Sequence, residues 1–134
     1  MSDWNRAIID EFRANKGTVP SRFAGADLLL LHTKGAKSGL ERVNPVRYFM
    51  DGNRYVVVAS KGGADANPDW YRNLLAHPDV SVEVGTEQFA AMAAVASEPE
   101  RTRLYQKMEA LSSAFTDYKN KTSRVIPVVT LTRK

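Results

Sequence analysis

Apolar side chains recur at helical spacing over residues 1–16. Trp4, Ile8 and Phe12 stand four positions apart, and charged residues lie between them. Positions i and i+4 share one face of a helix, so the pattern predicts an amphipathic N-terminal helix. Gly17 follows the last apolar position and is typical of a helix end.

Apolar runs of strand length follow this helix. DLLLLHT, residues 27–33, is long enough for a buried strand and short for a helix. In VNPVRYFMDGNRYVVVAS, residues 43–60, two β-rich runs flank the Asp-Gly-Asn sequence at 51–53, which is typical of a hairpin turn. Further strands are predicted over residues 80–84, 87–97 and 125–134.

Two more helices are predicted between these strands. One covers residues 68–77 and begins at Pro68, since proline is tolerated in the first turn of a helix. The other covers residues 98–115. The apolar side chains that we expect to share the core-facing sides are Trp70, Leu74 and Leu75 in the first helix, and Leu104, Met108 and Leu111 in the second.

The order of elements is helix, strand, hairpin, helix, hairpin, helix, strand. Because hairpins join most of the strands, the sheet is expected to be largely antiparallel and to close into a small barrel. A length of 134 residues suits one domain over residues 1–134. The predicted fold class is α+β, mainly β, with three helices packed on the barrel.

Composition limits the kinds of chemistry available. The chain is 43% hydrophobic and 25% charged, which is ordinary for a globular protein. It has no cysteine, so disulfides, thiolate nucleophiles and CxxC zinc sites are excluded, and its two histidines lie far apart, so no metal site is expected. No signal peptide or membrane-spanning stretch is recognised, and we expect a cytoplasmic protein.

Positive charge gathers directly after the first predicted strand. HTKGAKSGLERVNPVR, residues 32–47, carries four cations and one acid, and the net charge of the chain is +4. The segment does not match the P-loop pattern GxxxxGK[ST], which excludes a Walker-type NTPase. Glycine backbone, the Ser38 hydroxyl, Lys37 and Arg42 are still suited to an anion. A solvated basic turn is the alternative.

A second loop of the same kind follows the hairpin. Ser60, Lys61, Gly62 and Gly63 again combine a hydroxyl, a cation and glycines at the end of an apolar strand. Two such loops suggest one shared ligand. In the next helix, Trp70 and Tyr71 stand next to the polar Asn73. Core packing is the alternative to ligand contact for Trp70, whereas Asn73 could cap, pair across the core or bond a cofactor. Phe115 and Tyr118, near the end of the last helix, could wall an aromatic pocket or take part in ordinary packing.

Acid–base and nucleophilic machinery is missing from the sequence. No Ser–His–acid set is indicated, His32 is expected to be a structural, hydrogen-bonded histidine, and Asp65 and Asp69 resemble helix-start residues more than a carboxylate pair. An enzyme of this composition would depend on a bound organic cofactor. Nucleic-acid binding is not expected, because the lysines lie in turns and the strands are aliphatic.

Three motifs in fixed order resemble one family. T-x-G-x-K-S-G-x-x-R-x-x-P at 33–45, ASKGG at 59–63 and NPDWYRNL at 67–74 resemble the deazaflavin-dependent nitroreductases, which use reduced coenzyme F-420. The resemblance covers nearly the whole chain and implies a split β-barrel like that of FMN-binding oxidases. One departure is Ala36, where many members of this family have arginine.

The resemblance assigns roles to particular residues. It implies that Lys37, Ser38 and Arg42 hold the phosphate and acidic tail of the cofactor, that residues 60–63 line its ring and linker, and that residues 70–73 frame the site. The full cofactor set it implies is Lys37, Ser38, Gly39, Arg42, Pro45, Ala59, Ser60, Lys61, Gly62, Gly63, Trp70, Tyr71 and Asn73. Ser60 and Tyr118 are the hydroxyls predicted to donate a proton to the acceptor.

The implied reaction is hydride transfer from reduced coenzyme F-420 to an electron-poor acceptor such as a quinone, a nitroaromatic or an activated enone. Two alternatives stay open: an FMN-dependent oxidoreductase of the same fold, and a carrier that binds the deazaflavin without catalysis. The sequence leaves monomer and homodimer open. The N-terminal helix is expected to dock on the barrel, with contact to a membrane surface as its alternative.

Overall fold

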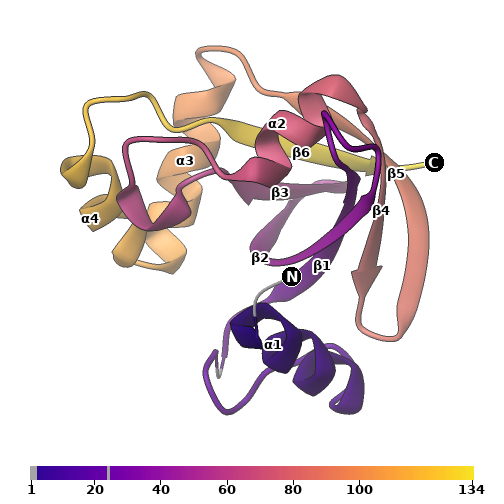
Figure 1. Ribbon diagram of the computed structural model, residues 1–134. Coiled ribbons are helices and arrows are strands. Elements are labelled where there is room, and N and C mark those ends of the chain that lie inside the picture. The colour runs from indigo at the N-terminus through magenta and orange to yellow at the C-terminus, as the bar shows by residue number, and fades with distance from the viewer. Residues whose placement is uncertain (1–2, 24) are drawn as a thin grey trace.

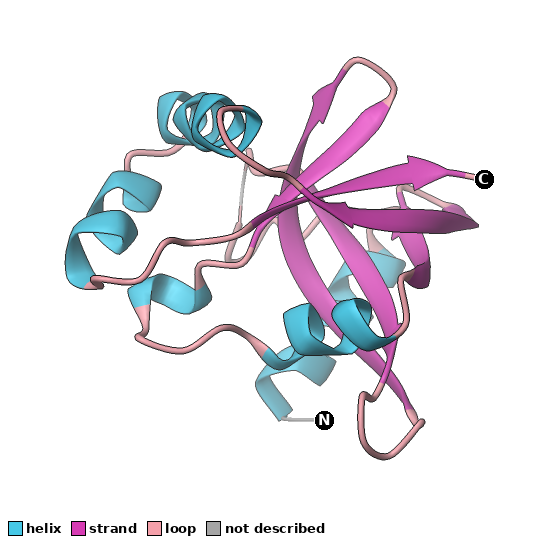
Figure 2. Ribbon diagram, turned by 90° about the horizontal axis from the view of Figure 1, so that it is seen from above, coloured by secondary structure: helices cyan, strands magenta, loops and turns pink. Residues whose placement is uncertain are grey.

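Six antiparallel strands form a closed barrel in the computed structural model, which describes residues 3–23 and 25–134 (Figure 1). The strand order around the barrel is β1-β2-β3-β6-β5-β4. Figure 2 shows some helices to the left of the strands and others across them at the lower centre. The strands are β1 (Leu28–Lys34), β2 (Glu41–Asp51), β3 (Arg54–Val58), β4 (Asp79–Val84), β5 (Glu87–Val95) and β6 (Val128–Arg133). The predicted barrel is confirmed.

The four consecutive leucines of β1 are buried on both faces of the strand. Leu29 and Leu31 belong to the core cluster inside the barrel, whereas Leu28 and Leu30 pack beneath the N-terminal helix. Successive side chains of a strand point to opposite faces, so a strand covered on both sides reads as a continuous apolar run.

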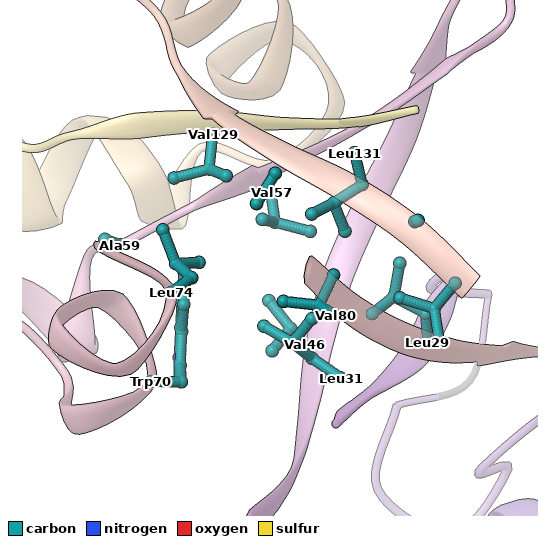
Figure 3. Packing of buried hydrophobic residues seen from close by; sticks show 13 residues of the cluster. Leu29, Leu31, Val46, Val57, Ala59, Trp70, Leu74, Val80, Val129 and Leu131 are labelled. Atoms are coloured by element: carbon teal, nitrogen blue, oxygen red, sulfur yellow. The ribbon is translucent and has the colours of Figure 1, made fainter. Parts of the chain in front are cut away.

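Helix α2 (Asp69–Ala76) closes one end of the barrel. Trp70 and Leu74 are buried in the same cluster as the inner residues of the strands, and Figure 3 shows both side chains on the side of the helix that faces them. Leu75 was expected on this face, but it is exposed. One helical position is a rotation of about 100°, which carries Leu75 away from the barrel.

Helices α3 (Glu100–Leu111) and α4 (Ala114–Lys121) cover the outer face of β3 and β6. The sequence predicts one helix over 98–115, whereas the chain leaves the helical conformation at Ser112, which is extended, and then starts α4. Leu104 and Met108 are buried as expected. Leu111, the last residue before the break, is exposed.

Helix α1 (Asp3–Ala14) docks on the barrel, as predicted. Its residues Ile8, Ile9 and Phe12 are buried against the outer face of β1. At the end of the helix, Arg13 donates two hydrogen bonds to Glu83 of β4, at 3.1 and 2.7 Å. None of the helices in the described part of the chain is long and apolar enough to cross a bilayer.

Candidate functional site

The SKGG segment forms a tight turn at the end of β3. A short 3₁₀ helix, η1 (Lys61–Gly63), follows Ser60, and Gly62 has a φ of 64°, in the left-handed region that glycine adopts without strain. Gly63 lies directly against α4, because a Cβ added there would be 3.0 Å from the Cα and carbonyl oxygen of Tyr118. The turn and α4 are therefore packed backbone to backbone.

Arg124 holds this turn from the segment that precedes β6. Its guanidinium donates to the carbonyl oxygens of Ser60 at 2.8 Å, Ala64 at 2.8 Å and Ala59 at 3.2 Å, and to Oδ1 of Asn67 at 2.8 Å. The planar fork of arginine suits several acceptors at once. One side chain thus fixes both ends of the loop between β3 and α2.

A largely apolar cavity of about 480 Å³ opens beside this turn. It lies where the three core clusters meet, since Ile8, Leu28 and Phe23 come from the α1 cluster, Val46 and Trp70 from the barrel interior, and Val58, Phe115 and Tyr118 from the α3–α4 layer. Behind its aromatic wall, the buried Tyr105 hydroxyl donates to the Phe115 carbonyl at 2.6 Å, and burial raises the pKa of Tyr105 to about 12.

Few polar groups face this cavity. Its polar lining residues are Asn5, Arg47, Ser60, Lys61, Ser112 and Tyr118, and none of the described residues that line it is acidic. Ser60 is only 8% exposed, yet its hydroxyl makes no hydrogen bond to any of the described residues. The hydroxyl is not sealed from solvent, since no buried side-chain oxygen or nitrogen of the described residues lacks a partner, and it can therefore bond to a ligand in the cavity.

A polar groove of about 650 Å³ lies on the other side of β2. The basic loop 35–38, Arg42 and Asn44 of β2, and the first turns of α2 line it. Lys37 and Arg42 form no ion pair within the described part of the chain, whereas Arg72 pairs with Asp69. The groove therefore carries a positive charge that is suited to an anion.

Asn73 attaches the basic loop to α2. Its Oδ1 accepts a hydrogen bond from the Ala36 N–H at 3.0 Å, and its Nδ2 donates to Thr33 Oγ1 at 3.1 Å. Of the roles that the sequence left open for Asn73, pairing across the structure is the one observed. Ala36 thus contributes its backbone N–H to the attachment of the loop. The third cation of the groove is Arg72, since Lys34 lies outside the groove lining.

The groove and the cavity adjoin each other along the same two elements. Asn44 and Asp69 line the groove, whereas their neighbours Pro45 and Trp70 line the cavity. A ligand with an anionic part and a flat apolar part would fit this arrangement, and a phosphorylated deazaflavin with an acidic tail has both. Cations for its phosphate and a partly aromatic cavity for its ring are present in the chain.

Most of the site residues expected from the sequence come together here. The groove is lined by Lys37, Ser38, Arg42 and Asn73, and the cavity by Pro45, Ser60, Lys61, Gly62, Trp70 and Tyr118. Four expected residues line neither: Gly39 closes the basic loop, Ala59 is fully buried, Gly63 packs on α4 and Tyr71 packs against the barrel core.

Two cations were missed by the sequence analysis. Arg47 lines the cavity and Arg72 lines the groove. The alternation of β2 carries a signal for the first, since Arg47 is two residues after Pro45 and so lies on the same face. Arg72 has no comparable signal, because its place depends on how α2 sits on the barrel.

The residues set aside as structural have structural contacts. His32 is buried, with Nε2 at 2.6 Å from Glu83 and Nδ1 at 3.3 Å from Glu41. Asp65 accepts a hydrogen bond from Thr122, and Asp69 begins α2. The expectation that His32 is a hydrogen-bonded structural histidine is confirmed.

Comparison with known proteins identifies relatives of this chain. The model of the F420H(2)-dependent quinone reductase family matches residues 4–133. An F420H(2)-dependent quinone reductase of Mycobacterium tuberculosis (strain H37Rv) is 42% identical over 127 residues, which cover 92% of this chain and 85% of the relative.

Solved structures agree with this relationship. An F420-H2 dependent reductase (FDR-A) is 34% identical, with a TM-score of 0.71 over 78% of this chain and 92% of that protein. A structure described as a domain-swapped dimer is 31% identical, with a TM-score of 0.73 over 96% and 97% of the two chains. The match spans nearly the full chain, the identity is high, and the closed barrel is shared, so this protein belongs to the F420H(2)-dependent quinone reductase family.

Proposed function

We propose that this protein is an oxidoreductase that uses reduced coenzyme F-420 to reduce quinones. The observation that supports this most is the pairing of a cationic groove with an apolar cavity along β2 and α2, in a chain of this family. When bound, the deazaflavin supplies a hydride. The protein binds, orients and shields the reactants.

The groove is the proposed place of the phosphate and the acidic tail. Lys37 and Arg42 supply charges that no described residue pairs with, Ser38 supplies a hydroxyl, and Asn73 keeps the basic loop in place. Charge-assisted hydrogen bonds to an anion are stronger than neutral ones. Arg72 adds a third cation whose charge is shared with Asp69.

The cavity is the proposed place of the ring and the acceptor. Ser60, Lys61 and Gly62 contribute the turn at its edge, and Pro45 and Trp70 contribute apolar surface. Gly62 leaves the space beside its Cα open, since a Cβ added there meets no atom within 4 Å. A flat molecule can therefore approach the backbone closely at this point.

Ser60 and Tyr118 are the proposed proton donors to the reduced acceptor. Both line the cavity, and neither hydroxyl forms a hydrogen bond to another described residue. A hydroxyl within reach of the acceptor would contribute as a general acid. Turnover of Ser60→Ala at full cofactor occupancy tests this role, and an unchanged kcat would remove it from Ser60.

The proposed partners are a quinone-type acceptor and a second copy of the chain. The relative described as a domain-swapped dimer supports a homodimer, which light scattering of the purified protein would test. For α1, the burial of Ile8, Ile9 and Phe12 against β1 favours docking on the barrel over contact with a membrane.

The decisive experiment is a fluorescence titration of the protein with coenzyme F-420 and with FMN, at low and raised salt, followed by a quinone reduction assay. We expect binding of the deazaflavin that weakens with salt, weak binding of FMN, and steady turnover.

Lys37→Gln should weaken binding of coenzyme F-420 by about tenfold, because it removes one charge-assisted contact. Arg133→Gln, at the far rim of the barrel, is the matched control and should bind normally. A preference for FMN would contradict the proposal, and binding without turnover would indicate a carrier.

A further inference from the structure

The apolar cavity contains positive charge without a counter-charge. Arg47 and Lys61 line it, and no acidic residue among those described does. In residues 3–23 and 25–134, neither side chain forms an ion pair or hydrogen bond to the protein. Asp27, beside Leu28 on the paired strand, is not within ion-pair distance of Arg47. Lys61 is exposed, whereas Arg47 is half-buried, and a charged group in partly apolar surroundings is costly unless something pairs with it.

The strand fixes Arg47 at this position. It lies within β2, opposite Leu28 of β1, and it shares a face of the strand with Pro45. Leu28 and Pro45 also line the cavity. The cations that line the groove are Lys37, Arg42 and Arg72, and Arg47 is not among them.

We propose that Arg47, assisted by Lys61, selects acceptors with a flat aromatic body and an oxygen that carries negative charge or gains it on reduction. This inference rests on the proposed function. A quinone that accepts a hydride, with its two electrons, from the reduced deazaflavin becomes a hydroquinone monoanion. It then takes one proton and leaves as the hydroquinone. A guanidinium beside that oxygen favours the anion.

The test compares two ligands of equal shape and different charge. The affinities of 2-naphthoate and 2-naphthamide are measured on the F-420-loaded protein, both by fluorescence and as inhibition constants against a neutral quinone. We expect the naphthoate to bind about tenfold more tightly than the naphthamide. Arg47→Gln should abolish this preference and leave the affinity for naphthamide unchanged. Arg47→Lys should retain part of it, because the charge remains but the fork is lost.

Two further measurements separate this inference from the proposed function. Arg133→Gln, a surface arginine paired with Glu87, should keep the full charge preference. Affinity for coenzyme F-420 is measured for Arg47→Gln as well, so that the two naphthalenes are compared at the same cofactor occupancy in both proteins. If the unmodified protein binds both naphthalenes equally, or neither, the inference is overturned. It is also overturned if the preference survives in Arg47→Gln. If the unmodified protein does not bind coenzyme F-420 at all, the proposed function fails, while a charge preference measured without cofactor would still support the role of Arg47.

Discussion

At the scale of single residues, the site depends on side chains that hold its two loops in place. Arg124 lies outside the cavity lining, yet its guanidinium bonds to four acceptors of the loop that carries Ser60. Asn73 does the same for the basic loop with two hydrogen bonds. Such residues position the groups that could bind or react.

Replacing Arg124 by lysine should loosen the SKGG turn. A lysine ammonium is a single point and cannot reproduce the fork that reaches four acceptors. We expect trypsin to cleave after the exposed Lys61 about tenfold faster in Arg124→Lys, since cleavage of a native protein follows local opening. The fragments can be followed by mass spectrometry, and the thermal midpoint should stay within a few degrees.

The matched control for this variant is Arg133→Lys. Arg133 pairs with Glu87 on the exposed rim and does not contact the turn, so cleavage after Lys61 should keep the rate of the unmodified protein. Equal cleavage rates in the two variants would show that Arg124 does not order the loop.

At the scale of elements, α2 contributes both to the barrel core and to the groove. It closes the barrel with Trp70 and Leu74, and it lines the groove with Arg72 and Asn73. Its eight residues would be a marginal helix in isolation, so packing on the barrel must supply most of its stability. Loss of that packing should therefore impair the groove as well as the fold.

Two adjacent leucines of α2 provide a matched test. Leu74 is 2% exposed and Leu75 is 55% exposed. Leu74→Ala should lower the free energy of unfolding by about 3 kcal/mol, because it removes buried methyl groups and leaves a cavity. Leu75→Ala should change it by less than about 0.5 kcal/mol. Urea denaturation measures both, and equal effects would contradict the proposed closure of the barrel by α2.

The positions of helices and strands were more predictable from sequence than which of their residues face the core. The Asp-Gly-Asn turn and the LLLL run give strand positions from local chemistry, and those predictions are confirmed. The break at Ser112 was missed because the apolar spacing continues to Phe115, which belongs to the first turn of α4. Leu75 and Leu111 were misplaced for a related reason: spacing indicates a face, but tertiary packing decides where that face ends.

In the candidate site too, local sequence patterns predicted some residues, and tertiary packing placed the others. The motifs indicated Lys37 and Arg42 for the groove and Ser60 and Lys61 for the cavity. Each of these pairs comes from one short stretch of sequence and lines one site. The contribution of α1 to the cavity, through Trp4 and Ile8, required the helix to be docked first. Contacts between segments that are far apart in the chain leave no local pattern in the sequence, so these two residues could not be predicted from it.

At the scale of the whole molecule, ion pairs join distant parts of the chain. Asp51 of the β2–β3 hairpin accepts hydrogen bonds from Arg103 and Lys107 of α3, and Glu83 of β4 binds Arg13 of α1. These guanidinium and ammonium groups hold the pKa of Asp51 well below its usual range, and Arg13, followed by His32, lowers the pKa of Glu83. Arg101 lowers the pKa of Glu98 to about 2.

These lowered pKa values predict weaker stability in acid. The unfolded chain, with ordinary carboxyl pKa values near about 4, takes up protons before the folded protein does. Stability from these groups is therefore present above about pH 5 and is lost as the pH falls toward the folded-state values. Urea midpoints at pH 7, 5, 4 and 3 should be constant over the first interval and then fall.

Glu83→Gln should be less stable at pH 7 and should lose less stability on acidification, since its share of the linkage is gone. Glu87→Gln, on the exposed rim, is the control and should follow the pH profile of the unmodified protein. A profile for Glu83→Gln as steep as that of the control would mean that the Arg13–Glu83 contact contributes nothing to acid sensitivity.

The meeting of three core clusters at one cavity has a consequence for how such proteins diversify. Each wall of the cavity belongs to a different packed unit: α1 with β1, the barrel interior with α2, and the layer of α3 and α4. Substitutions in one wall leave the packing of the other two in place. Proteins of this architecture can therefore change the electron acceptor that they use through substitutions in a single helix, while the packing of the other two walls is kept.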